Sequence, residues 1–256
     1  MVLDSSIFRH LNSGLYEATA AAAGPWSATH CHGGAPAALL AAALEDLPLK
    51  VPMDLARFTI DLVRPVPIST PLRIKIDEGR QGSRVQLVTA DLLAGGVLLA
   101  TASGLRVRSV DPNSSLPMRP PPDVARHQSM PGGFSAEFTI VPVSGGFGRL
   151  GPASVWFRLG SSLVAGADTS PVARCIAAAD FGSGVAHELS FEAWEFPSLD
   201  LTVSLARPPN GSWTLLESRW LRAQGGRTSC LSSLSDLQGP FGTAIQTVLI
   251  EPRRNQ

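Results

Sequence analysis

Two segments of the chain are apolar on nearly every side, one in each half. The first follows Gly33 and Gly34 and runs through residues 37–44, which are all alanine or leucine. The second begins after Ser170, a favoured N-cap residue that is followed by proline, and ends at Asp180. A helix at the surface keeps a polar face, so a helix that is apolar all round must be buried. The pattern predicts two equivalent buried helices.

Apolar and polar positions alternate along the segments that follow each helix. Alternation of this kind, broken by glycine and proline at the turns, is typical of half-buried strands. The predicted strands are residues 57–63, 72–76, 84–93 and 97–108 in the first half and residues 201–207, 213–220, 228–234 and 243–249 in the second. One buried helix followed by a long antiparallel sheet, present twice, is an α+β architecture.

The two halves repeat each other at a constant offset. Residues 59–65, which read Thr-Ile-Asp-Leu-Val-Arg-Pro, match residues 202–208, which read Thr-Val-Ser-Leu-Ala-Arg-Pro, so the offset is 202 − 59 = 143. Agreement at a fixed offset indicates an internal repeat. The alternative is that two unrelated antiparallel meanders share an Arg-Pro end and turn glycines. Prolines and serines gather at residues 111–133, which predicts a linker between a first domain at 1–110 and a second at 134–256.

Charge and cysteine content narrow the class of protein. The chain has 21 basic and 21 acidic residues and a net charge of zero, so it lacks the electrostatic footprint of a nucleic-acid partner. Three cysteines far apart in the sequence do not form a disulfide framework, which favours a reducing compartment. Asp4 stands where a signal peptide carries positive charge, and no apolar run is long enough to cross a bilayer. We expect a cytoplasmic protein with no membrane partner.

Three motifs suggest chemistry that their context does not support. Residues 146–151 match the Gly-x-Gly-x-x-Gly dinucleotide pattern, but residues 155–159 read as a strand where that pattern needs a helix. The run His30-Cys31-His32 has metal-binding residue types, but adjacent residues on a strand cannot all face one ion. No Gly-x-Ser-x-Gly motif is present to supply a nucleophilic serine. We expect no metal and no cofactor.

Two longer stretches are more specific. The first is His32-Gly33-Gly34 leading into the alanine-rich segment that ends at Glu45, and the second runs from Trp194 to Trp213 and continues through residues 236–239 and 244–249. Together they resemble the double hot-dog acyl-CoA thioesterases, the type II group and its actinobacterial relatives. The resemblance implies an α+β double hot-dog fold, in which each of two tandem modules wraps a sheet around a long helix. It also implies an acyl-CoA substrate and a homo-oligomer.

The resemblance further implies hydrolysis by a water molecule that an Asp, a Thr or Ser and a Gln hold. The Asp of the family falls on Asp200, which would be the base, and the Gln falls on Gln246, which would orient the water. The hydroxyl position falls on Trp220 or Leu221, neither of which carries a hydroxyl. Trp220 is therefore expected at the substrate site, with Ser218, Thr228 and Ser229 as nearby hydroxyl residues that could substitute.

The entry to the first helix is the expected oxyanion site. Gly33 and Gly34 expose backbone N–H groups at the positive end of the helix, where a negative oxygen is stabilised. The alternative is that these glycines only permit close packing. His32 is expected to bind the substrate carbonyl, or else to be a structural histidine. Asp180 begins an Asp-Phe-Gly-Ser-Gly motif similar to one in the actinobacterial relatives. We expect Asp180 either to contact the substrate or to be a structural turn residue.

Two functions follow from these expectations. The first is an acyl-CoA thioesterase that uses Asp200-activated water. The second is a degenerate hot-dog protein that binds acyl-CoA or a lipid without turnover, which the missing hydroxyl at Trp220 favours. A hydratase on the same fold would need an Asp and a His at a set spacing, and that pattern is not found.

Overall fold

The computed structural model describes residues 6–12, 14–110 and 117–253. The helices are α1 (Gly34–Glu45), α2 (Gly133–Ala136), α3 (Pro171–Ala179) and α4 (Gly182–Val185), with 3-10 turns η1 (Ala20–Ala22) and η2 (Val124–Arg126). The strands are β1 (Ser6–Asn12), β2 (Leu15–Ala18), β3 (Met53–Leu62), β4 (Pro71–Gln81), β5 (Val85–Ala94), β6 (Val97–Arg108), β7 (Phe138–Ser144), β8 (Ala153–Leu159), β9 (Ser162–Val164), β10 (Trp194–Glu195), β11 (Asp200–Leu205), β12 (Thr214–Trp220), β13 (Arg227–Asp236), β14 (Gly239–Leu249) and β15 (Glu251–Pro252).

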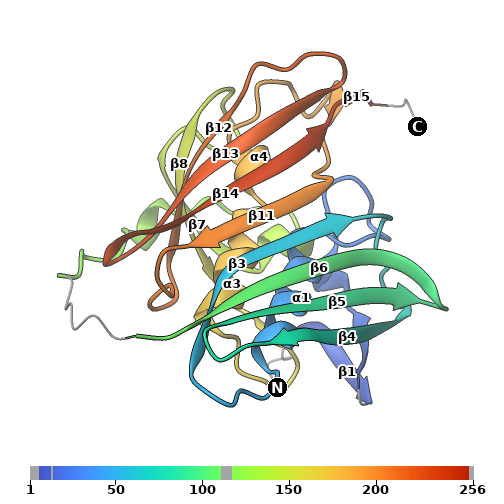
Figure 1. The fold of residues 1–256 in the computed structure, drawn as a ribbon. Coiled ribbons are helices and arrows are strands. Elements are labelled where there is room, and N and C mark those ends of the chain that lie inside the picture. The colour runs from blue at the N-terminus through green and yellow to red at the C-terminus, as the bar shows by residue number, and fades with distance from the viewer. Residues whose placement is uncertain (1–5, 13, 111–116, 254–256) are drawn as a thin grey trace.

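One long sheet runs through both halves of the chain (Figure 1). Its strand order is β7-β8-β12-β13-β14-β11-β3-β6-β5-β4-β2-β1-β9. Read outwards from the central β11–β3 pair, the next three strands of the two halves correspond: β14 matches β6, β13 matches β5 and β12 matches β4. The internal repeat predicted from the sequence is therefore present as two copies of one module joined edge to edge.

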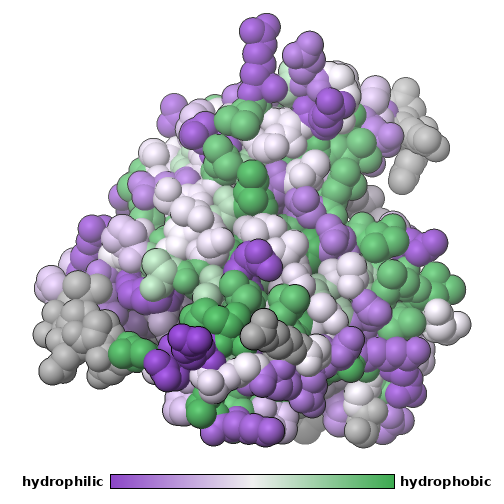
Figure 2. All heavy atoms as spheres, viewed as in Figure 1, coloured by the Kyte–Doolittle hydropathy of each residue, from purple (hydrophilic) through white to green (hydrophobic). Residues whose placement is uncertain are grey.

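The two long helices lie on one face of this sheet and pack against each other (Figure 1). Most side chains of α1 are buried, including Leu39, Leu40 and Leu44, and so are most of those of α3. The main hydrophobic core draws residues from both halves. Side chains of mixed polarity cover the opposite face of the sheet (Figure 2), as expected for strands that keep one face on the core.

The predicted helices and strands are confirmed, with ends that differ by a few residues. The segment after the Gly-x-Gly-x-x-Gly match is a strand, β8, as predicted. The predicted linker is described only from residue 117 onward, where it contains η2 and leads into α2 at Gly133. Its residues 111–116, like Asp4, lie outside the described residues.

Candidate active site

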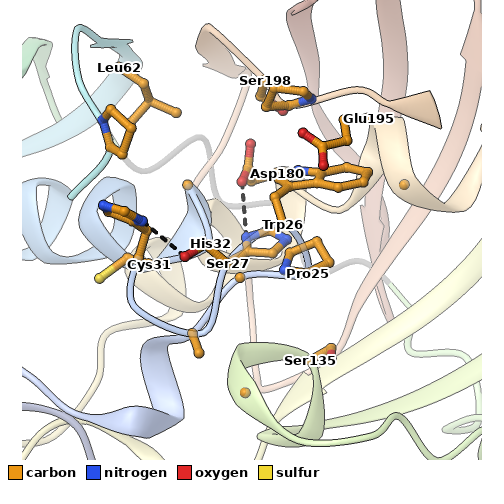
Figure 3. A pocket seen from close by; sticks show the side chains of 18 of the residues that line it. Pro25, Trp26, Ser27, Cys31, His32, Leu62, Ser135, Asp180, Glu195 and Ser198 are labelled. Carbon is orange, nitrogen blue, oxygen red and sulfur yellow. Dashed lines mark hydrogen bonds and ion pairs between the residues drawn. The ribbon is translucent and has the colours of Figure 1, made fainter. Parts of the chain in front are cut away.

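A cavity of about 890 Å³ lies between the two halves, where the N-terminal end of α1 meets the C-terminal end of α3. Its walls are largely apolar and aromatic, and they include Trp26, Leu62, Phe147, Phe181, Phe191 and Phe196. Ligand sites commonly enclose about 300–1,000 Å³ and combine apolar walls with a few polar groups. The polar groups of this cavity (Figure 3) are therefore the candidates for chemistry.

Two glycines let the helix ends approach each other. A Cβ atom at Gly34 would lie 2.7 Å from the carbonyl oxygen of Ala177, and one at Gly33 would lie 2.8 Å from Asp180 Oδ2. Cβ atoms do not come this close to other heavy atoms. At Gly34 the near atom is backbone, so any other residue would push α1 away from α3, whereas at Gly33 the side chains of Asp180 and Leu62 would have to move. Close packing, one of the two expected roles of these glycines, is thus a property of both.

Asp180 caps the C-terminal end of α3 and lines the cavity with only 5% of its surface exposed. Its Oδ1 accepts a hydrogen bond of 2.9 Å from Gln246 Nε2, and its Oδ2 lies 3.0 Å from His32 Nδ1. Side chains from β14 and from the segment before α1 therefore hold the two carboxylate oxygens. This arrangement places Asp180 at the polar centre of the cavity.

Gln246 lies buried behind the cavity, at an inward position of β14. Its Oε1 accepts a hydrogen bond of 3.0 Å from the N–H of Ser183, which identifies Nε2 as the donor side of the amide. Nε2 donates to Asp180 Oδ1 and, over 2.7 Å, to Ser198 Oγ. The amide therefore joins a carboxylate and a hydroxyl at one place.

Ser198 places a hydroxyl group beside Gln246, with Oγ 2.7 Å from Gln246 Nε2. It precedes β11, forms an isolated bridge with Val248 and lines the cavity. Trp220 and Leu221, the positions expected for the hydroxyl residue, do not line the cavity, whereas Ser198, from the connection between α3 and β11, does. That connection, residues 180–199, is longer than its counterpart 46–52 in the first half, and it runs past the end of β14.

Asp200 lies outside the cavity. In the pairing of β11 with β14, Thr202 is opposite Ile245, so Asp200 is opposite Thr247 and not beside Gln246. Its Oδ1 accepts a hydrogen bond of 2.5 Å from the Thr247 N–H, and its Oδ2 accepts one of 2.9 Å from Thr247 Oγ1. Because adjacent strand residues face opposite sides of a sheet, Thr247 and Asp200 lie on the side away from Gln246. The geometry therefore favours Asp180 over Asp200 as the base.

Trp220 and Thr228 also lie away from the cavity lining. Trp220 packs edge-on against Phe196 and donates from Nε1 to the carbonyl oxygen of Ser183 at 3.0 Å. Thr228 Oγ1 donates to the Leu221 carbonyl oxygen at 2.6 Å, which ties the ends of β12 and β13 together. Neither side chain lines the cavity, although both were expected at the substrate.

Gly33 and Gly34 differ in what their backbone N–H groups do. The Gly34 N–H donates to His32 Nδ1 at 3.1 Å. The Gly33 N–H has no hydrogen-bond acceptor among the described residues, and Gly33 lines the cavity just before the first turn of α1. Of the two N–H groups expected to bind an oxyanion, only that of Gly33 is therefore available to a ligand. His32 lines the cavity as expected, but its Nδ1 faces Asp180.

Other reactive or charged groups at the cavity are not placed for catalysis. Burial raises the pKa of the Cys31 thiol to about 12, so this cysteine stays protonated and is a poor nucleophile. Arg64 lines the cavity and donates to the Leu98 carbonyl oxygen at 2.8 Å. Glu195 also lines the cavity, and its Oε1 lies 3.8 Å from Arg253 Nε. The cavity therefore combines one cation with two carboxylates, those of Asp180 and Glu195.

Within residues 6–12, 14–110 and 117–253, no cluster of three or more His, Cys, Asp or Glu side chains is placed to hold a metal ion. No helix in the same part of the chain has both the length and the apolar character needed to cross a membrane.

Two family models match the chain. The model of the acyl-CoA thioesterase N-terminal domain matches residues 22–107, and the model of the acyl-CoA thioesterase C-terminal domain matches residues 112–250. The two matches place the cavity residues Gly33 and Asp180 in different domains. A comparison with curated protein sequences finds no match.

Several solved structures are similar over nearly the whole chain. A putative thioesterase II from Thermobifida fusca aligns with a TM-score of 0.72 at 16% identity and covers 95% of each chain. A protein with a hot dog fold from Alicyclobacillus acidocaldarius aligns with a TM-score of 0.74 at 15% identity and covers 98% of each. An acyl-CoA thioesterase II from Mycobacterium marinum aligns with a TM-score of 0.66 at 16% identity, over 97% of this chain and 96% of that one. The predicted α+β double hot-dog fold is confirmed.

Proposed function

The chain belongs to the acyl-CoA thioesterase family, and from this premise we propose that it hydrolyses an acyl-CoA thioester with Asp180, Ser198 and Gln246 as its water-activating residues. The observation that carries the proposal is the meeting of a carboxylate, a hydroxyl and an amide around Gln246 Nε2, within 2.9 Å of Asp180 Oδ1 and 2.7 Å of Ser198 Oγ. These are the residue types that hold and deprotonate a water molecule. The three side chains come from three separate segments of the chain. Their meeting at one place supports a shared role in catalysis.

In the proposed reaction, Asp180 accepts a proton from water while Ser198 and Gln246 orient it. The water oxygen attacks the thioester carbonyl carbon, and the carbonyl electron pair moves to oxygen. When the carbonyl re-forms, the carbon–sulfur bond breaks with its electrons on sulfur. The sulfur is protonated at the expense of the proton held by Asp180, so the products are a carboxylic acid and a thiol, and Asp180 is a carboxylate again. No covalent acyl-enzyme is required, which agrees with the protonated state of Cys31.

The oxyanion is stabilised at the start of α1. The Gly33 N–H lacks a protein acceptor among the described residues and lies at the positive end of the helix. It comes from the first domain, whereas Asp180 comes from the second, so both modules contribute to one site. A preorganised donor of this kind contributes about 2.7–4 kcal/mol of transition-state stabilisation.

Binding without turnover, the second function considered from the sequence, loses its main argument. That argument was the absence of a hydroxyl at Trp220, and Ser198 provides one in hydrogen-bond contact with Gln246. The thioesterase is therefore the function we propose.

The test is thiol release from a panel of acyl-CoAs that spans short, long, branched and aryl chains. We expect turnover that falls about 10²-fold or more in Asp180→Asn, since general base catalysis contributes about 10²–10⁴-fold. Saturable acyl-CoA binding with no thiol release from any member of the panel would contradict the proposal.

A further inference from the structure

His32 makes a contact that the proposed reaction leaves unused. Its Nδ1 lies 3.0 Å from Asp180 Oδ2 and also accepts the Gly34 N–H at 3.1 Å. The imidazole packs against Phe134 and Phe181, with ring centroids 5.1 and 4.5 Å away, and only 12% of the side chain is exposed. The ring is therefore held in one orientation with Nδ1 directed at the base.

The contact can hold one proton in either of two positions. With the proton on Nδ1, the imidazole donates to the Asp180 carboxylate. With the proton on Asp180 Oδ2, the carboxyl O–H and the Gly34 N–H share the single lone pair of Nδ1. The Gly34 N–H gives up this acceptor when Nδ1 itself is protonated. The proton crosses a gap of 3.0 Å, which requires no movement of either side chain.

The structure assigns His32 a role through Asp180: we propose that it is the proton partner of the base. After Asp180 has taken a proton from water, the Oδ2–H bond breaks and an Nδ1–H bond forms, which returns Asp180 to the carboxylate and leaves an imidazolium. The thiolate released by cleavage of the carbon–sulfur bond then takes the Nε2 proton, which leaves neutral His32 with its remaining proton on Nδ1. Exchange with solvent protons restores the Nε2–H form before the next turnover. In balance, the water gives one proton to His32 and the other stays with the carboxylic acid, while the sulfur gains the proton that Nε2 held.

The free edge of the imidazole fits this route. Nδ1 contacts Asp180 Oδ2 and the Gly34 N–H, whereas Nε2 has no hydrogen-bond partner in the described part of the chain. Because His32 lines the cavity, its Nε2 can reach a ligand there. This inference rests on the proposed thioesterase function, with Asp180 as its base.

The test uses His32→Asn, since asparagine can still accept the Gly34 N–H but cannot carry a proton between two atoms. The matched control is His10→Asn, because His10 is exposed on β1 and does not line the cavity. We expect kcat for thiol release to fall about 10²-fold in His32→Asn with KM within twofold, and to be unchanged in His10→Asn. Added imidazole is expected to restore part of the rate in His32→Ala but none in His32→Asn, where the cavity is filled. A kcat of His32→Asn within threefold of wild type would overturn the proposal.

A second measurement is independent of turnover. The ¹⁵N signal of His32 Nδ1, assigned by its loss in His32→Asn, is expected to move in Asp180→Asn, while the signals of His187 stay in place and report an intact fold. An unchanged His32 signal would overturn the proton-sharing contact. If wild type releases no thiol but the signal moves, the thioesterase function fails while the contact stands, so the two failures are distinguishable.

Discussion

Thr59 Oγ1 and Thr202 Oγ1 form a hydrogen bond of 3.1 Å across the central strand pair β3 and β11. The two residues are opposite each other in the antiparallel register, and they are also equivalent positions of the 143-residue repeat. A pair that is both opposite and equivalent lies on a two-fold axis. The chain therefore has two related places where the start of one long helix meets the end of the other.

Only one of these two places is the cavity. At the other, Ser170 caps α3 and donates to Glu45 Oε2 at 2.6 Å, and neither residue lines the cavity. Arg106 closes this end further, because its guanidinium donates to the Leu44 carbonyl oxygen. The asymmetry follows from the longer connection 180–199, which supplies Ser198 and part of the cavity wall in the second half alone.

Ser170→Ala tests this asymmetry. The substitution removes the N-cap hydrogen bond to the Ala173 N–H and the bond to Glu45, so we expect the free energy of unfolding to fall by about 0.5–2 kcal/mol. Turnover of acyl-CoA should remain within twofold of wild type. Chemical denaturation and thiol release on the same preparation measure the two effects. A large loss of kcat in a folded variant would mean that the second helix contact takes part in catalysis.

Gly34→Ala should disturb the site through helix packing. Its Cβ would lie 2.7 Å from the Ala177 carbonyl oxygen and 3.2 Å from Asp180 Cβ, so α1 and α3 must separate. We expect a loss of stability of about 1–3 kcal/mol and a fall in kcat, measured by thermal unfolding and thiol release. Gly148→Ala is the matched control, because a Cβ there meets no atom within 4 Å. Equal behaviour of the two variants would contradict the close contact.

Trp220→Phe should affect stability and not substrate affinity. The change removes the Nε1–H donor to the Ser183 carbonyl oxygen and leaves the aromatic contact with Phe196. We expect a loss of about 1–3 kcal/mol in the free energy of unfolding, because a buried acceptor loses its donor. KM for acyl-CoA should stay within twofold. A severalfold rise in KM with little loss of stability would place Trp220 at the substrate after all.

Asp236 makes stability depend on pH. Burial by itself raises the pKa of this carboxyl, but hydrogen bonds from Arg207 and from the N–H groups of Asn210 and Gln238 outweigh burial and lower the pKa below its usual value. The unfolded chain then binds the proton more readily, so the stabilisation is present above the unfolded pKa and is lost as the pH falls through the folded pKa.

The variant Asp236→Asn isolates this effect. Since removal of one partner of a buried ion pair costs about 3–5 kcal/mol, we expect a loss of that size at pH 7. The difference in the free energy of unfolding between Asp236→Asn and wild type should become smaller below about pH 4, where the carboxyl of the unfolded chain is protonated. Urea unfolding at pH 7 and pH 3 gives the comparison. A gap of equal size at both pH values would mean that the charge of Asp236 does not stabilise the fold.

The sequence carries enough information to predict the modules and part of the site. The apolar run of residues 37–44 can only be a buried helix, and the 143-residue offset relates the strands of the two halves. Gln246 is a polar residue at an inward position between Ala244 and Val248, and a buried amide of this kind must have partners. Asp180 directly follows the second apolar helix, so the run of apolar residues before it also predicts that it lies close to the core.

Two features of the site could not be derived from the sequence in the same way: the position of Ser198 at the cavity and the orientation of Asp200 away from it. The connection 180–199 is largely irregular, so no periodicity indicates where its residues lie. Asp200 is a carboxylate at the start of a strand, as a base could be, but its orientation depends on the register of β11 with β14. A one-residue change of register would reverse the face of every side chain on the strand. Only the structure fixes that register.

The most direct test compares Asp180→Asn with Asp200→Asn in the release of thiol from acyl-CoA. Both variants replace a carboxylate by an isosteric amide, but only Asp180 contacts Gln246 at the cavity, while Asp200 bonds Thr247 on the other side of the sheet. We predict a fall in kcat of about 10²-fold or more for Asp180→Asn and a change within threefold for Asp200→Asn. Loss of turnover in Asp200→Asn with activity kept in Asp180→Asn would contradict the assignment of the base.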